Sequence, residues 1–140
     1  MTHPEIRDLA ANAKPLTARR VLVVEDELMI AMLIEGALQQ AGCEVIGPLV
    51  RLGPALTAAT EGALDIAVLD RDLAGEDTRP VAETLEARGV PFVFLTGYGT
   101  DSLPPDKPHW RALGKPFRTQ TLIAALTAMV APAPQPLPYR

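Results

Sequence analysis

Short apolar runs alternate with segments of helical periodicity along this chain of 140 residues, and this alternation constrains the fold most strongly. The runs favour buried β-strands because they are brief and rich in Val, Leu and Ile. The predicted strands are 20–24, 44–50, 65–70, 91–96 and 110–114, and the predicted helices are 27–42, 54–62, 79–89 and 118–130. Strands separated by helices predict an α/β fold in which a parallel sheet carries helices on both faces.

One connection breaks this alternation. Residues 97–109 stand where another helix is expected, but they contain two glycines and three prolines. Pro104 and Pro105 would interrupt a helix, because proline lacks the backbone N–H and clashes with the preceding turn. The fourth helix is therefore predicted to be short or disordered.

The length of the chain fits one domain. Hydrophobic residues make up 48% of the sequence but aromatic residues only 4%, so the core must be mostly aliphatic. We predict a folded domain over 20–130, a mobile N-terminal extension over 1–19 and a Pro-rich tail over 131–140. The tail places proline at every second position, which favours an extended chain.

Charge and hydropathy argue against two classes of partner. The formal net charge of −4 does not suit a nucleic-acid surface. No apolar run approaches the ~18 residues that span a bilayer, and the N-terminus lacks the apolar core of a signal peptide. We expect a cytoplasmic protein with neither a nucleic-acid nor a membrane partner.

Carboxylates follow two of the predicted strands. Glu25 and Asp26 come directly after the first strand, while Asp70 ends the third and Asp72 follows two residues later. The carboxyl ends of parallel strands meet at one edge of the sheet. Two unit charges ~4 Å apart repel by about 4 kcal/mol at an effective dielectric near 20, so such a cluster must raise its pKa values or recruit a cation. The ligands are all oxygens, which predicts Mg²⁺.

Two more strand ends carry residues suited to phosphoryl chemistry. Thr96 ends the fourth predicted strand and Lys115 follows the fifth. A metal ion and a lysine can neutralise phosphoryl oxygens, and a hydroxyl can donate a hydrogen bond to one of them. Asp70 can then act as the nucleophile and form an acyl phosphate.

The sequences VLVVEDE, IAVLDRDL, FLTGYG and LGKPF, in this order, resemble the motifs of the receiver domain of two-component response regulators. The similarity covers residues 20–130. It implies a flavodoxin-like, doubly wound sheet of five strands in the order 2-1-3-4-5. It also implies that Asp70 accepts the phosphoryl group and that Glu25, Asp26 and the backbone carbonyl of Asp72 hold Mg²⁺ together with Asp70.

The resemblance further implies the remaining roles. Thr96 and Lys115 contact the phosphoryl group, and the Lys115–Pro116 peptide bond is cis. The phosphoryl group comes from the histidine of a sensor kinase or phosphotransfer protein. The chain is then a phosphoacceptor that assists its own phosphorylation and dephosphorylation rather than an enzyme, and it signals through contacts with an unidentified downstream protein.

The sequence departs from the usual receiver pattern at one position. Ala112 stands where receivers carry an aromatic switch residue, three positions before the lysine. Together with PFVFLTGYG, this resembles a subgroup marked by Phe-Ala-Thr-Gly, often stand-alone and tied to alphaproteobacterial stress signalling, although Leu95 replaces the Ala. We hypothesise that activation orders residues 97–109 as Thr96 shifts towards phosphate, with Tyr98 as a substitute ring.

Other functions fit parts of the sequence. The chain could be a receiver cut from a larger response regulator or hybrid kinase, a phosphate sink, or a pseudo-receiver that binds without phosphorylation. The motif LDRDLAG also opens phosphatases of the haloacid-dehalogenase type. Those enzymes need an acidic pair after the lysine, and no Asp or Glu follows Lys115.

Overall fold

The structure is a computed structural model that describes residues 15–97 and 103–130. Its main sheet consists of β1 (Arg20–Val24), β2 (Glu44–Leu49), β3 (Ile66–Asp70), β6 (Phe92–Thr96) and β7 (Ala112–Gly114). The helices are α2 (Leu28–Gln40), α3 (Leu52–Glu61), α4 (Arg79–Ala87) and α5 (Thr119–Val130). Two short strands, β4 (Asp72–Leu73) and β5 (Glu76–Asp77), pair as an antiparallel hairpin.

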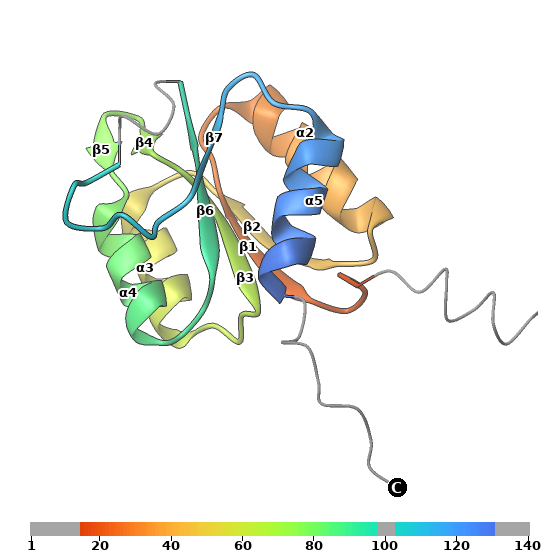
Figure 1. Cartoon of the computed structure of the whole chain (residues 1–140), viewed down its shortest axis with the longest axis horizontal. Helices are drawn as coiled ribbons and strands as arrows, with labels where there is room; N and C mark the ends of the chain where they lie inside the picture. The colour runs from red at the N-terminus through yellow and green to blue at the C-terminus, as the bar shows by residue number, and fades with distance from the viewer. Residues whose placement is uncertain (1–14, 98–102, 131–140) are drawn as a thin grey trace, which may run out of the picture.

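The sheet is parallel, with the strand order β2-β1-β3-β6-β7. This is the predicted order 2-1-3-4-5 once the two hairpin strands are left out. Helices α3 and α4 cover one face of the sheet, and α2 and α5 cover the other (Figure 1). The predicted flavodoxin-like fold is confirmed.

Alternating side chains of the central strands fill two cores, one on each face of the sheet. In β1, Leu22 and Val24 belong to the core under α3 and α4, whereas Val21 and Val23 belong to the core under α2 and α5. All four are fully buried. Because both faces are covered, the strand is apolar along its whole length, which is the pattern that the sequence shows.

The outer strand β2 contains Pro48, and the structure places β2 at the edge of the sheet. Proline cannot donate to a strand ladder, so an edge position is where it is tolerated. Helix α3 begins at Leu52, two residues before the predicted start at Pro54. A proline in the first turn is tolerated because the N–H groups there have no acceptor within the helix.

The packed part of the chain begins earlier than residue 20. Leu16 is only 1% exposed and belongs to the core under α2 and α5. The backbone N–H of Ala18 also donates to the carbonyl of Gly42 at 2.8 Å. Residues 15–19 therefore pack on the domain, whereas the predictions for 1–14 and for the tail fall outside the described residues.

The connection between β6 and β7 contains no helix within its described part, residues 103–111. Trp110 fixes this segment to the sheet, because its ring centroid lies 5.4 Å from that of Phe92 and 5.5 Å from that of Phe94. Residues 103–111 are therefore held against the sheet by these ring contacts, although they form no helix.

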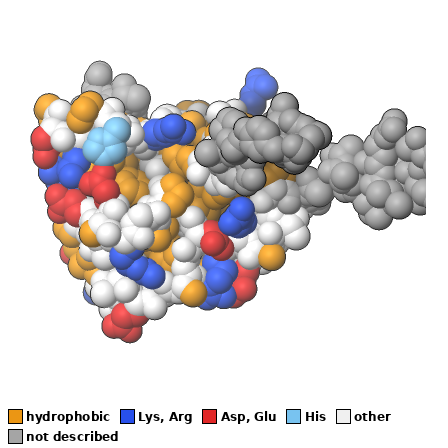
Figure 2. Space-filling model, turned by 60° about the horizontal axis from the view of Figure 1, so that its bottom comes forward, with side chains coloured by type: hydrophobic (Ala, Val, Ile, Leu, Met, Phe, Trp, Pro, Cys, Tyr) orange, Lys and Arg blue, Asp and Glu red, His pale blue; other side chains and the backbone are white. Residues whose placement is uncertain are grey.

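A second set of contacts ties the same segment to α4. The Glu86 carboxylate accepts hydrogen bonds from Lys107 Nζ at 2.8 Å and from Trp110 Nε1 at 3.0 Å, and it also contacts His109. Figure 2 shows acidic, basic and histidine side chains gathered on one part of the surface. These hydrogen bonds, from His109 first, hold the pKa of Glu86 at about 2, below its ordinary value of 4.5.

We predict that Glu86→Gln destabilises the fold at neutral pH. Because the pKa of Glu86 is lowered by folding, its contribution is complete above pH 4.5 and is lost as the pH falls towards 2. Urea unfolding at pH 7, 4.5 and 3 should show a difference between the variant and the wild type that shrinks as the pH falls. The exposed Glu61→Gln serves as control. A difference that does not change with pH would contradict the assignment.

Candidate functional site

Carboxylates from two neighbouring strands meet at the carboxyl edge of the sheet, which is the upper edge in Figure 1. Glu25 and Asp26 continue β1, and Asp70 is the last residue of β3, which pairs with β1. One carboxylate oxygen from each of the three lies within 4.8 Å of the others. Glu25 is fully buried and Asp70 is 4% exposed, so water screens their charges poorly.

A lysine reaches the same place from the next pair of strands. In the ladder of β6 and β7, Thr96 lies opposite Gly114, and the backbone N–H of Lys115 donates to the Thr96 carbonyl at 2.7 Å. The Lys115 Nζ lies 3.1 Å from Glu25 Oε1 and 3.4 Å from Asp70 Oδ2. The peptide bond between Lys115 and Pro116 is cis, as the resemblance implies.

The surroundings of Asp70 disfavour its ionised form. Burial, and then the hydrogen bond and charge of Glu25, raise the pKa of Asp70 from its ordinary value of 3.8 to about 8, although Lys115 acts in the opposite direction. Asp70 therefore holds a proton at neutral pH unless another cation enters the cluster. A protonated carboxyl group is a poor nucleophile, so the cluster needs that cation for chemistry.

The lysine alone does not balance the carboxylates. Burial would lower the pKa of Lys115, but the hydrogen bond of Glu25 and the charge of Asp70 outweigh it and raise the pKa. Lys115 is thus a cation in the site. It also contacts Glu27 Oε1 at 3.2 Å, which spreads one positive charge over several carboxylates.

The donor set fits a hard divalent cation. Glu25 Oε1 is buried and lacks a hydrogen bond of good geometry, although it is close to the Lys115 ammonium. Buried carboxylate oxygens without a donor are costly, and they are the ligands that Mg²⁺ prefers. Glu25, Asp26 and Asp70 are the residues that would hold the ion.

The other predicted site residues differ in how close they lie to the carboxylate cluster. The Asp72 side chain is exposed, and its backbone N–H donates to Asp70 Oδ1 at 3.3 Å, which places this residue next to the cluster. Thr96 is 2% exposed at the end of β6. Ala112 is partly buried in β7, and Tyr98 lies outside the described residues.

One residue of the site was not predicted. Glu27 stands immediately before α2, where an acidic side chain ordinarily serves the helix end, but it makes no capping hydrogen bond and pairs with Lys115 instead. Its backbone N–H donates to Glu25 Oε2 at 3.1 Å. The only sequence signal for this role is that Glu27 adjoins the other two carboxylates.

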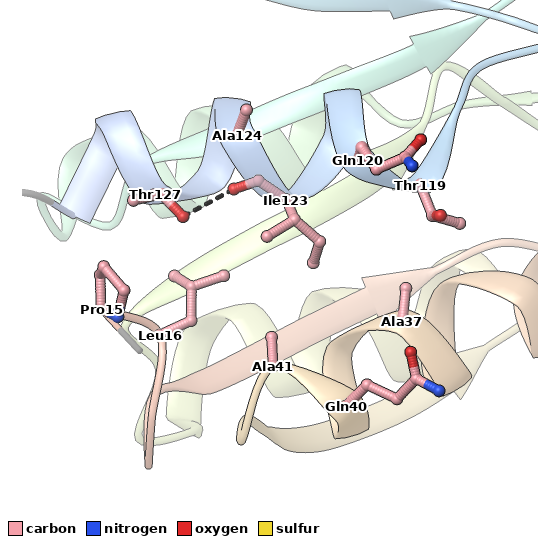
Figure 3. Close-up of a pocket in the computed structure, with 10 residues that line it drawn as sticks. All are labelled: Pro15, Leu16, Ala37, Gln40, Ala41, Thr119, Gln120, Ile123, Ala124 and Thr127. Atoms are coloured by element: carbon pink, nitrogen blue, oxygen red, sulfur yellow. Dashed lines mark hydrogen bonds between the residues drawn. The ribbon is translucent and has the colours of Figure 1, made fainter. Parts of the chain in front are cut away.

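A cavity of about 460 Å³ lies away from this cluster, between α2 and α5 (Figure 3). Pro15, Leu16 and Thr127 lie at one end of it, and Thr119 and Gln120 at the other. None of its lining side chains is charged. It therefore cannot bind a metal ion or phosphate by charge, and it is not part of the candidate site.

We predict that Asp70→Asn stabilises the metal-free protein. Because folding raises the pKa of Asp70 to about 8, the ionised side chain costs stability increasingly as the pH rises from 3.8 to 8. In EDTA, the melting temperature of the variant should exceed that of the wild type at pH 8 by several degrees, the shift expected from roughly 1 kcal/mol, and by less at pH 5. Equal melting temperatures at both pH values would contradict this.

No protein-family model matches the chain, and no curated protein matches it. Solved structures do. The solution structure of SdrG from Sphingomonas melonis Fr1 is 38% identical, with a TM-score of 0.71, and the match covers 84% of this chain and 98% of SdrG. A response regulator receiver protein from Sinorhizobium medicae WSM419 is 25% identical over 81% of this chain and 94% of its own, with a TM-score of 0.70.

A further structure shows the shared fold alone. The receiver domain of the sensor histidine kinase PA1611 from Pseudomonas aeruginosa PAO1 is 23% identical, with a TM-score of 0.68, over 83% of this chain and 100% of that domain. Within the described ranges of our chain, no helix is long and apolar enough to span a bilayer. The strand order of the sheet and the 38% identity to SdrG show that the chain belongs to the receiver-domain family of response regulators.

Proposed function

We propose that this receiver accepts a phosphoryl group on Asp70 from a phosphohistidine, in a reaction that depends on Mg²⁺. The observation that carries the proposal is the position of the Asp70 carboxylate, which lies beside Glu25 and Asp26 and 3.4 Å from Lys115 Nζ. The nucleophile, the oxygen ligands for a metal ion and the ammonium group of Lys115 thus lie in one site.

The step is a displacement at phosphorus. An ionised Asp70 oxygen forms the new P–O bond while the P–N bond of the donor histidine breaks, and the histidine nitrogen keeps the electron pair. Mg²⁺, when bound by Glu25, Asp26 and Asp70, supplies charge neutralisation for the carboxylates and the phosphoryl oxygens. Lys115 contacts a phosphoryl oxygen and Thr96 donates a hydrogen bond to another.

Magnesium as the cation has support from a solved relative. The PA1611 receiver domain is described with a magnesium ion coordinated in its active-site cleft. In our chain, Asp70 would release its proton when the ion binds, because the divalent cation takes the place of the proton and favours the ionised carboxylate. The backbone carbonyl of Asp72 is the further ligand that the resemblance implies.

In this proposal the chain acts as a signalling phosphoacceptor and not as an enzyme with a separate substrate. Its output would be a contact with a downstream protein that recognises the phosphorylated form. A role as phosphate sink, or as the receiver part of a larger regulator or hybrid kinase, uses the same chemistry. The membership of the Phe-Ala-Thr-Gly subgroup stays a prediction, as does the ordering of residues 97–109, whose part from 103 onwards is already held in place.

We predict that acetyl phosphate and Mg²⁺ add one phosphoryl group to the wild type and none to Asp70→Asn. Intact-mass spectrometry at neutral pH detects the added mass, and alkaline hydroxylamine should remove it, as expected of an acyl phosphate. Lys115→Ala should slow the reaction by about 10²-fold, because a positioned cation on the phosphoryl oxygens is lost. Labelling of Asp70→Asn at the wild-type rate would disprove the proposal.

The start of α2 offers a surface for a protein donor. Its exposed apolar side chains are Leu28, Met29, Met32 and Leu33, with exposed fractions from 50% to 84%. They follow Glu27, which contacts Lys115 in the site. An exposed apolar group beside a polar site marks a protein contact, so we assign this surface to the phosphohistidine protein.

We predict that Met29→Glu slows phosphotransfer from a phosphorylated histidine-containing protein by at least tenfold, because a charge replaces an apolar contact. Transfer from acetyl phosphate should stay within twofold of the wild-type rate. Gln39→Glu places the same charge at the far end of α2 and serves as the matched control. An equal loss with both donors would show that the substitution damages the site and not the docking surface.

A further inference from the structure

We propose that Thr78 is a positioning residue for the phosphoacceptor, through a buried hydroxyl that fixes the peptide group following Asp70. The inference rests on the proposed function and adds to it a residue that touches no reacting atom. Thr78 stands eight positions after Asp70 and immediately before α4. Four observations carry the argument.

The first observation is that the Thr78 hydroxyl does not serve the helix that it precedes. Threonine before a helix ordinarily accepts a hydrogen bond from the first turn. In this structure Thr78 makes no side-chain cap, and Asp77 Oδ1 accepts from the backbone N–H of Arg79 at 2.8 Å instead. The neighbouring carboxylate therefore satisfies the helix end, and the Thr78 hydroxyl is available for another acceptor.

The second observation is where that hydroxyl goes. Thr78 Oγ1 lies 2.6 Å from the carbonyl oxygen of Asp70 and 3.2 Å from that of Arg71. A hydroxyl donates one proton, so the shorter contact is its main hydrogen bond. Thr78 is fully buried, which means that no water can replace the donor without a change of structure.

The third observation concerns the other end of the same peptide group. The backbone N–H of Arg71 donates to the carbonyl of Leu95 in β6 at 2.8 Å. The group between Asp70 and Arg71 is planar, and both its oxygen and its hydrogen are now held. Rotation of this plane is blocked, so the direction in which the Asp70 side chain leaves the strand is fixed as well.

The fourth observation links this plane to the metal cluster. The backbone N–H of Asp72 donates to Asp70 Oδ1 at 3.3 Å, so the carboxylate is oriented by the chain that turns after it. That turn is the β4–β5 hairpin, and it ends at Thr78. Removal of the hydroxyl would leave the buried Asp70 carbonyl without this donor and release the chain that carries the nucleophile.

The consequence is a change in rate and not in donor binding. Displacement at phosphorus needs the attacking oxygen in line with the leaving group, and small misplacements are costly. Thr78→Val keeps the shape of the side chain but loses the hydroxyl. We expect the maximal rate of phosphorylation by acetyl phosphate to fall about tenfold at saturating Mg²⁺, with an unchanged half-saturating donor concentration.

Two variants isolate the hydroxyl. Thr78→Ser keeps it and should restore the maximal rate to within twofold of the wild type. Thr84→Val is the matched control, since Thr84 Oγ1 donates to the Pro80 carbonyl within the same helix at 2.9 Å and has no contact with Asp70. Circular dichroism at the assay temperature confirms equal folding, and Thr78→Ala replaces Thr78→Val if the latter does not fold.

The outcomes separate this inference from the proposed function. A folded Thr78→Val with a maximal rate within twofold of the wild type overturns the inference, as does a Thr78→Ser variant as slow as Thr78→Val. In both cases wild-type labelling leaves the proposed function intact. If the wild type takes up no phosphoryl group at Asp70, the proposed function falls and the inference falls with it.

Discussion

The repulsion among Glu25, Asp26 and Asp70 governs the chemistry of this molecule. One oxygen from each lies within 4.8 Å of the others at the sheet edge, and water screens the buried Glu25 and Asp70 poorly. In the absence of a metal ion the cluster is relieved by a proton on Asp70, whose pKa is about 8. The same proton blocks the nucleophile. A divalent cation removes both problems at once, since it replaces the proton and leaves the carboxylate ionised.

The fold keeps the carboxylates together against this repulsion. β1 and β3 are adjacent and buried on both sides, so neither strand can move its acidic end without disturbing two apolar cores. Lys115 follows β7, which pairs with β6 on the side away from β3, and this ladder fixes its backbone. The site is thus built on rigid strands, and the residues that follow Asp70 are held by the Thr78 hydroxyl and the β4–β5 hairpin.

Much of this could be predicted from the sequence, because buried parallel strands are continuous apolar runs and their acidic ends meet at one edge. The resemblance supplied the strand order. The sequence did not predict the contact of Glu27 with Lys115, which joins residues 88 positions apart, or the hydroxyl of Thr78, whose local context indicates a helix cap. Leu16 falls within the predicted mobile extension over 1–19, yet it is buried in the core, and a single leucine beside polar residues does not reveal such a contact.

Exchange of a proton for a metal ion is measured most directly by calorimetric titration of the full chain with Mg²⁺ at pH 7, in two buffers of different ionisation enthalpy. The observed heat then reports how many protons leave on binding. We expect the wild type to bind Mg²⁺ and to release between half a proton and one proton, about what a pKa near 8 requires, and Asp70→Asn to release none. Binding of Mg²⁺ with the same heat in both buffers, or no binding at all, would contradict it.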